Sequence, residues 1–183
     1  MQNKNLRALC ECAMFTAAAL ALSYAKVDVA ALGGSISLVM IPLVLCAIRW
    51  GVGYGLAAGL VFGTLKFFIG GGTAINWQSM LLDYSVAYMF VGFAGLLKGK
   101  SKTAWRAAII GGLGRFLVHY VSGITIYAIV ENTTSFGVTT SNPWLYSLLY
   151  NGAYMLPNIA LTAVAVGLLA IPLGKYLRRE DLR

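Results

Sequence analysis

Residues 77–97, WQSMLLDYSVAYMFVGFAGLL, form an apolar segment that contains a single carboxylate, Asp83. A helix needs about 20 predominantly apolar residues to cross a bilayer, and this segment is long enough. An ionised carboxylate at the middle of a bilayer costs roughly 2.5–3.5 kcal/mol on insertion scales. We therefore expect Asp83 to face a partner, a cavity or a ligand inside a bundle of helices formed by the rest of the chain.

The composition is that of an integral membrane protein. Of the 183 residues, 59% are hydrophobic and only 11% are charged, and the mean hydropathy is +0.76. The apolar runs are too long and too continuous for the alternating strands of a β-barrel. We predict an all-α fold, a six-transmembrane-helix bundle that forms one membrane-embedded domain over residues 1–183. The expected helices lie at about Leu6–Tyr24, Ile36–Ile48, Val52–Ile69, Trp77–Leu97, Ala107–Val130 and Pro143–Gly174.

Lys and Arg gather near both ends of the chain, at residues 49–51 and in the 98–106 loop. Cytoplasmic loops of membrane proteins carry an excess of these residues. The formal net charge of +8 is therefore a topology signal, not a nucleic-acid signal, and we expect both termini in the cytoplasm. The sequence around Ser23-Tyr24-Ala25 also resembles a signal-peptide cleavage site. We interpret the segment before it as the first membrane helix, because the even number of crossings requires it.

Small residues recur every four positions in two of these helices. Gly51, Gly55, Gly59 and Gly63 make a ridge that favours close helix packing. The stripe of Ala13, Ala17 and Ala21 has two readings, internal packing or a docking face for another subunit. We expect Lys66 to extend outward to the membrane surface, and the three cysteines to be packing residues.

Two predicted helices carry polar stripes. Arg115, His119, Gly123 and Tyr127 follow one another at steps of four, so they share one helix face. In the last helix the stripe is formed by Asn151, Tyr154, Asn158 and Thr162. Tyr146 lies about 140° away from Asn151 on an ideal helix, so it joins this face only if the first turn is irregular.

The buried polar groups suit a small, flat, partly cationic heterocycle. A carboxylate offsets positive charge, aromatic rings stack, and amide and imidazole groups meet ring nitrogens. The alternative is that Asp83, the only acid expected well inside a helix, pairs with Arg115 and that the tyrosines only pack. With one histidine, His119, a zinc-protease motif is impossible. We expect no catalytic residues, no cofactor and no metal. Neither an ATP-binding motif nor the repeat symmetry of a self-sufficient transporter is visible.

Several short motifs in a fixed order give a family resemblance over essentially the whole chain. They are Ala13-x-x-x-Ala17, Gly33-Gly34-Ser35-Ile36-Ser37, Met40-Ile41-Pro42, Arg49-Trp50-Gly51-Val52, Leu81-Leu82-Asp83-Tyr84, Arg115 with His119, Ser122-Gly123, Trp144-x-Tyr146-Ser147 and Tyr150-Asn151. The chain resembles the thiamine-specific substrate-binding subunits (S components) of energy-coupling factor (ECF) transporters. The resemblance implies a prokaryotic plasma-membrane protein that binds thiamine near the external face and is not an enzyme. The family works with a transmembrane coupling subunit and two cytoplasmic ATPases.

The resemblance also implies roles for individual residues. Asp83 matches the acid that offsets the thiazolium charge, in place of the Glu of some relatives. The other matching pocket positions are Tyr84, His119, Gly123, Tyr127, Tyr146 and Asn151. Tyr127 stands where some relatives have a stacking Trp, and the region around Gly33 lacks the Trp that some relatives place in the first external loop. Ala13 and Ala17 match the motif that contacts the coupling subunit.

Three other functions stay open on the sequence. One is an S component for another small vitamin or precursor. A second is a self-sufficient facilitator or channel. The third is an assembly protein without a ligand, which a pairing of Asp83 with Arg115 would allow.

Overall fold

The structure is a computed structural model, and it describes residues 4–28, 34–70, 72, 74, 76–126, 133–135 and 138–182. Five segments in this part of the chain are long and apolar enough to span a membrane. They are α1 (Lys4–Leu22), α3 (Val52–Ile69), the segment Trp77–Leu97, the segment Ser101–Thr125 and α7 (Pro143–Leu169). Large apolar side chains such as Leu117, Leu156 and Leu168 are exposed on these segments, as expected where lipid covers the surface. The prediction of a helical membrane fold is confirmed.

The remaining apolar helix, α2 (Met40–Trp50), has only 11 residues and lies at the centre of the bundle. All of its residues except Ile41 are buried. A helix that is apolar on every face is enclosed by other elements, and α2 packs against α1, α3, α6 and α7. Pro42 is accommodated because it stands in the first turn, where no intrahelical hydrogen bond is lost.

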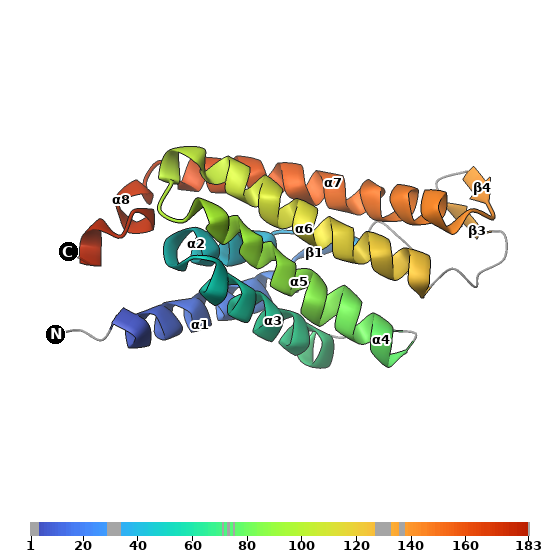
Figure 1. The fold of residues 1–183 in the computed structure, drawn as a ribbon, viewed down its shortest axis with the longest axis horizontal. Coiled ribbons are helices and arrows are strands. Elements are labelled where there is room, and N and C mark those ends of the chain that lie inside the picture. Colours follow the sequence, from blue (N-terminus) through green and yellow to red (C-terminus); the bar gives the residue numbers. More distant parts are fainter. Residues whose placement is uncertain are drawn as a thin grey trace.

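The segment Trp77–Leu97 changes its winding along its length. It consists of α4 (Trp77–Met80), the π-helical η1 (Leu81–Val86), α5 (Ala87–Phe90) and the 3₁₀-helical η2 (Val91–Leu97). After it, η3 (Ser101–Thr103) leads into α6 (Ala104–Thr125), which crosses the bundle beside α7 (Figure 1). A one-turn helix, α8 (Gly174–Leu177), and η4 (Glu180–Leu182) end the described chain.

The glycine ridge of α3 lies directly against the segment Trp77–Leu97. A Cβ added at Gly59 would stand 2.1 Å from the carbonyl oxygen of Tyr88, and one at Gly63 would stand 2.3 Å from that of Tyr84. On the other side of the contact, a Cβ at Gly92 would meet the backbone nitrogen of Leu56 at 2.3 Å. The ridge predicted from the sequence is therefore a backbone-to-backbone contact, and it fixes the helix that carries Asp83.

The structure contains two short hairpins that were not predicted, because the sequence of both segments is typical of loops. Strands β1 (Lys26–Asp28) and β2 (Ser35–Ser37) pair antiparallel, and so do β3 (Thr133–Ser135) and β4 (Val138–Thr140). The buried side chain of Asn158 on α7 holds β2 in place. Its Oδ1 accepts from the backbone nitrogen of Ser37 at 2.9 Å, and its Nδ2 donates to the carbonyl of Ser35 at 2.8 Å.

Both ends of the chain lie at one end of the bundle, and β3 and β4 lie at the other (Figure 1). Near the two chain ends, the guanidinium of Arg49 is completely buried between the carboxylates of Glu11 and Asp181. Arg49 Nη2 lies 3.1 Å from Glu11 Oε1 and 2.8 Å from Asp181 Oδ2. Glu11 also accepts from Trp50 Nε1 at 3.0 Å and from Tyr176 OH at 2.7 Å. The expectation that Asp83 is the only acid well inside a helix was wrong, because Glu11 belongs to α1 and is used in this cluster.

Candidate ligand-binding site

Asp83 stands in the π-helical turn η1. A π turn accommodates one more residue than an α turn, and such turns are frequent at functional sites. The helix begins with a capping box in which Asn76 Oδ1 accepts from the Ser79 nitrogen at 2.8 Å, and the Ser79 hydroxyl lies 3.2 Å from the Asn76 nitrogen. The start of the helix is thus fixed about two turns before Asp83.

The carboxylate of Asp83 pairs with His119 on α6. Oδ1 of Asp83 lies 3.2 Å from Nδ1 of His119, and the two side chains are 19% and 9% exposed. A hydrogen on Nδ1 would be donated to the carboxylate and would leave Nε2 as an acceptor. Nε2 is buried and has no hydrogen-bond partner among the described residues. The pair therefore offers both a carboxylate and an unused ring nitrogen.

Arg115 does not pair with Asp83, so the structure does not support the alternative of an Asp83–Arg115 ion pair. The Arg115 guanidinium lies over the ring of Tyr88, with Cζ 4.1 Å from the ring centroid. The hydroxyl of Tyr88 accepts from Nζ of Lys66 at 2.6 Å. The expectation that Lys66 extends outward was therefore wrong as well, because its ammonium reaches a fully buried tyrosine.

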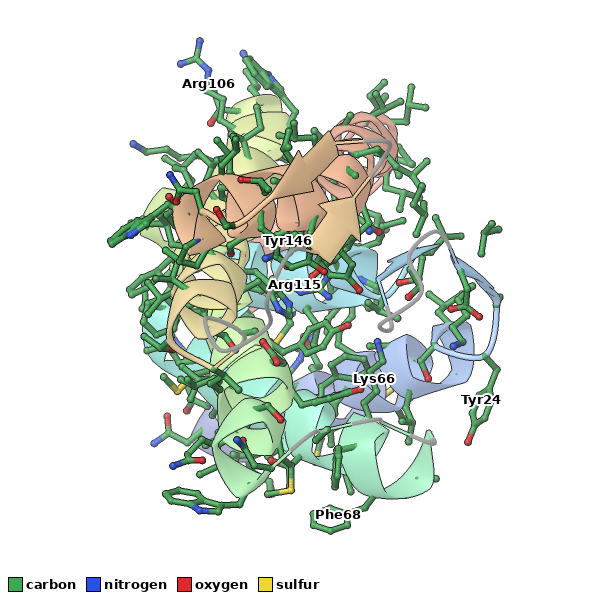
Figure 2. All side chains as sticks on the ribbon, turned by 90° about the vertical axis from the view of Figure 1, so that its right-hand side faces the viewer. Tyr24, Lys66, Phe68, Arg106, Arg115 and Tyr146 are labelled. Carbon is green, nitrogen blue, oxygen red and sulfur yellow. The ribbon has the colours of Figure 1, made fainter. Side chains whose placement is uncertain are left out.

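Figure 2 views the molecule from the end of the bundle that lies away from the termini. Arg115, Lys66 and Tyr146 lie in the interior of this view, whereas Tyr24, Phe68 and Arg106 point outward. The labelled groups inside the outline of the bundle in this view are thus two cationic side chains and one tyrosine.

Asn151 and Gly123 lie where α6 and α7 cross. Nδ2 of Asn151 donates to the carbonyl of His119 at 3.2 Å and to that of Ser147 at 3.0 Å, and Oδ1 accepts from Tyr154 OH at 2.7 Å. A Cβ at Gly123 would stand 2.2 Å from Ser147 Oγ. The absence of a side chain at Gly123 is thus what lets the two polar stripes meet.

A series of aromatic rings connects the start of α7 to His119. Tyr146 stacks on Tyr150 with centroids 5.7 Å apart and planes at 20°. Tyr150 meets Tyr154 edge to face at 5.9 Å, and Tyr154 meets His119 in the same way at 6.0 Å. Tyr146 is only half-buried. It stands in a helix that is regular from Pro143 onward, so its ring connects to the Asn151 face by stacking on Tyr150 and not through an irregular first turn.

The other predicted residues are placed as follows. Tyr84 is half-buried, and its ring lies 5.2 Å from that of Phe67 at 68°. Tyr127 and Gly33 lie outside the described residues. On α1 both Ala13 and Ala17 are exposed, so their stripe is not used for packing within the described chain.

Sequence reasoning missed Lys66, Tyr88 and Tyr150 as members of this interior. Tyr88 and Lys66 stand on facing helices, and only the glycine ridge signalled that those helices touch. Tyr150 was quoted in a motif, but its position between Tyr146 and Tyr154 at steps of four also predicts a shared face.

The fold and the site define a class, a multi-pass membrane protein whose helices enclose a carboxylate–imidazole pair and a series of aromatic rings. Comparisons with known proteins agree with it. The model of the family described as thiamine transporter protein matches residues 9–177. The thiamine transporter ThiT of Bacillus subtilis (strain 168) is 34% identical over 194 residues, which cover 98% of this chain and 98% of that protein.

A second relative and a solved structure give the same result. The thiamine transporter ThiT of Lacticaseibacillus paracasei is 29% identical over 92% of this chain and 89% of its own length. The structure of ThiT from Listeria monocytogenes matches with a TM-score of 0.82 at 30% identity, covering 94% of this chain and 98% of that one. The chain belongs to the thiamine transporter protein family and is a multi-pass plasma-membrane protein, which confirms the resemblance.

Proposed function

We propose that this chain is a high-affinity thiamine-binding S component of an ECF transporter. It is a binding subunit, not an enzyme, and thiamine is its ligand. The observation that carries the proposal is the Asp83–His119 pair in the interior of the bundle. The relatives named as thiamine transporters support the choice of ligand.

Thiamine joins a permanently cationic thiazolium ring to an aminopyrimidine, and the site has groups for each part. Asp83 offsets the thiazolium charge. Tyr84 and Tyr146, with Tyr127, supply aromatic surface for the rings. Nε2 of His119 accepts a hydrogen bond from the aminopyrimidine. Oδ1 of Asn151 bonds Tyr154 with one lone pair, which leaves the second for the ligand. Gly123 lets α7 approach α6 closely, which holds Asn151 beside the carbonyl of His119.

The transport partners follow from the same proposal. We assign six membrane-embedded helices, the five long spans and α2, with both termini in the cytoplasm, in one domain. The basic residues near the chain ends and in the 98–106 loop support this orientation. The exposed Ala13 and Ala17 form the contact with a transmembrane coupling subunit, because small residues let a second helix approach closely. Two cytoplasmic ATPases supply the energy for uptake.

Calorimetric titration of thiamine into the purified chain tests the proposal. Calorimetry is preferable to tryptophan fluorescence, because Trp77 and Trp144 are both largely exposed. We expect saturable binding of one thiamine per chain, with no displacement by another vitamin at equal concentration. A flat trace would contradict thiamine as the ligand, and displacement by another vitamin would favour the broader S-component function.

Flux measurements distinguish a subunit from a self-sufficient carrier. Liposomes that contain only this chain should take up no labelled thiamine, whereas addition of the coupling subunit, the ATPases and ATP should start uptake. Uptake by the chain alone would identify a facilitator and contradict the dependence on partners.

A further inference from the structure

A second site lies far from the Asp83–His119 pair, at the end of the bundle that carries both termini. It is a cleft of about 610 Å³ between η3, the end of α7 and α8. Its walls include Ser101, Lys102, Ala170, Ile171, Lys175 and Arg178. The thiamine site uses none of these residues.

One wall of the cleft is cationic. Lys102 and Lys175 are exposed, so their ammonium groups are accessible to a ligand. Arg178 is held in place, because its Nη1 donates to Ser101 Oγ at 2.9 Å and its Nε donates to Glu180 Oε1 at 2.6 Å. Three cations against the one carboxylate of Glu180 leave a net charge of +2, which favours an anionic ligand.

Other lining residues of the cleft are apolar, and one of them is open to the surroundings of the bundle. Ile171 is 78% exposed and lies beside Ala170 in the cleft lining. Gly167 adds no side chain to this apolar lining, and a Cβ there would stand 3.6 Å from Cβ of Trp105. Trp is enriched at the level of lipid headgroups, so Trp105 marks the depth at which the cationic wall meets the bilayer surface.

We propose that this cleft binds the phosphate headgroup of an anionic phospholipid of the cytoplasmic leaflet. Lys102, Lys175 and Arg178 hold the phosphate, and the acyl chain lies along Ala170 and Ile171. Basic pockets between helices on the cytoplasmic side bind such headgroups. A free phosphate would use the cationic wall but not the apolar lining, which favours the lipid. The alanine stripe proposed for the coupling subunit stands on α1, on the opposite side of Figure 1 from α7.

The test measures lipid retention by the purified full chain in native mass spectrometry. The probes are phosphatidylglycerol, the zwitterionic phosphatidylcholine and inorganic phosphate. The cleft variant is Lys102→Gln with Lys175→Gln. The control variant, Lys4→Gln with Arg106→Gln, removes the same charge from exposed residues at the same end but outside the cleft lining.

We expect the native chain to retain phosphatidylglycerol in preference to phosphatidylcholine. Each lysine near an anionic headgroup contributes roughly a fivefold gain in affinity, so the cleft variant should bind phosphatidylglycerol about 25-fold more weakly. The control variant should bind it as the native chain does. An equal loss in both variants would overturn the proposal, because it would trace the preference to overall charge. Complete displacement of the lipid by inorganic phosphate would also overturn it and identify a soluble anion as the ligand.

Discussion

The two ring nitrogens of His119 have different surroundings. Nδ1 is paired with Asp83, whereas Nε2 is buried without a hydrogen-bond partner among the described residues. Leaving a buried polar atom unpaired costs about 1–3 kcal/mol. A ligand that donates a hydrogen to Nε2 recovers this cost on binding, so the ligand-free site is prepared for such a donor.

Neutralising Asp83 tests whether its charge contributes to binding. Asp83→Asn keeps the size of the side chain but removes the negative charge that we propose offsets the thiazolium. We expect thiamine affinity to fall by about 1.5–3 kcal/mol, the range for a hydrogen bond to a charged group. Calorimetry measures the change. Glu180→Gln, a carboxylate neutralised in η4, is the control and should leave affinity unchanged. An unchanged dissociation constant for Asp83→Asn would exclude this carboxylate from the site.

For single residues, the sequence predicted the burial of side chains more accurately than it predicted their pairing. The stripe of Asn151, Tyr154, Asn158 and Thr162 is buried as predicted, because helical periodicity alone decides the face. The partner of Asp83 was left open between a ligand and Arg115. His119 stands one turn further along α6 than Arg115. Which of the two side chains faces Asp83 depends on how far the two packed helices are shifted along their axes, and the sequence does not give this shift.

Among the elements, the contact between α3 and the segment Trp77–Leu97 depends on missing side chains. Gly59→Ala would place a Cβ 2.1 Å from the carbonyl of Tyr88, and a backbone atom cannot move aside cheaply. We expect the free energy of unfolding to fall by about 1–3 kcal/mol, the usual cost of overpacking. Thiamine binding should weaken as well, because the displaced helix carries Asp83.

Gly53→Ala is the matched control for this change. It lies on the same helix, yet a Cβ there would have no neighbour within 4 Å. Ala is favoured over Gly in a helix by up to about 1 kcal/mol, so this variant should be as stable as the native chain or more stable. Thermal unfolding of both variants in detergent measures the difference. Equal stability of the two would contradict the backbone contact.

The alanine stripe of α1 gives a prediction about a different surface. Ala17→Trp adds a large ring to an exposed position, so thiamine binding by the isolated chain should stay unchanged. Uptake by the complex with the coupling subunit and ATPases should be abolished, because the ring prevents close helix approach. Leu168→Trp, on the exposed face of α7, should leave uptake intact. Loss of binding in the folded Ala17→Trp variant would argue against separate binding and docking surfaces.

Long apolar helices were predictable, and local departures from them were not. The span Trp77–Leu97 has the predicted bounds, because its length is set by the bilayer. Its π-helical turn at Leu81–Val86 was not predicted, because apolar composition and length do not distinguish a π turn from an α turn. The hairpins have strands of only three residues, too few for an alternating pattern.

On the scale of the whole molecule, the Arg49 cluster joins α1, α2 and the C-terminal segment. Arg49, whose guanidinium donates to the Asp181 carboxylate, lowers the pKa of Asp181 below its ordinary value. A carboxylate with a lowered pKa in the folded state stabilises the fold above the pKa of the unfolded state, about 3.9 for Asp. That stabilisation is lost as the pH falls from there through the folded-state pKa.

Asp181→Asn should therefore lower the free energy of unfolding by about 1.5–3 kcal/mol at neutral pH, the range for hydrogen bonds to charged groups. The difference between native chain and variant should shrink as the pH falls below about 4. Thermal unfolding across a pH series measures it. A constant difference down to the lowest pH would show that the carboxylate charge is not what stabilises the cluster.

The sequence was sufficient to predict the membrane class and the family, because composition and the order of motifs can be read without knowing the structure. It was not sufficient for the Arg49 cluster, in which Glu11 and Asp181 stand 38 and 132 positions from Arg49. The basic and aromatic residues at 49–51 predicted a position at the membrane surface for Arg49. Only the burial of α2 at the centre makes its last turn an interior position that needs counter-charges.

The central position of α2 also bears on how the protein is made. With 11 residues, α2 is about 17 Å long, far short of the roughly 30 Å hydrocarbon core. It leaves the ribosome before α6 and α7, the helices that later enclose it. Glu11 is already present when Arg49 emerges, whereas Asp181 is synthesised after all the membrane spans. During biogenesis α2 therefore depends on α1 alone for its first charge partner, and its enclosure is completed only when the C-terminal segment arrives.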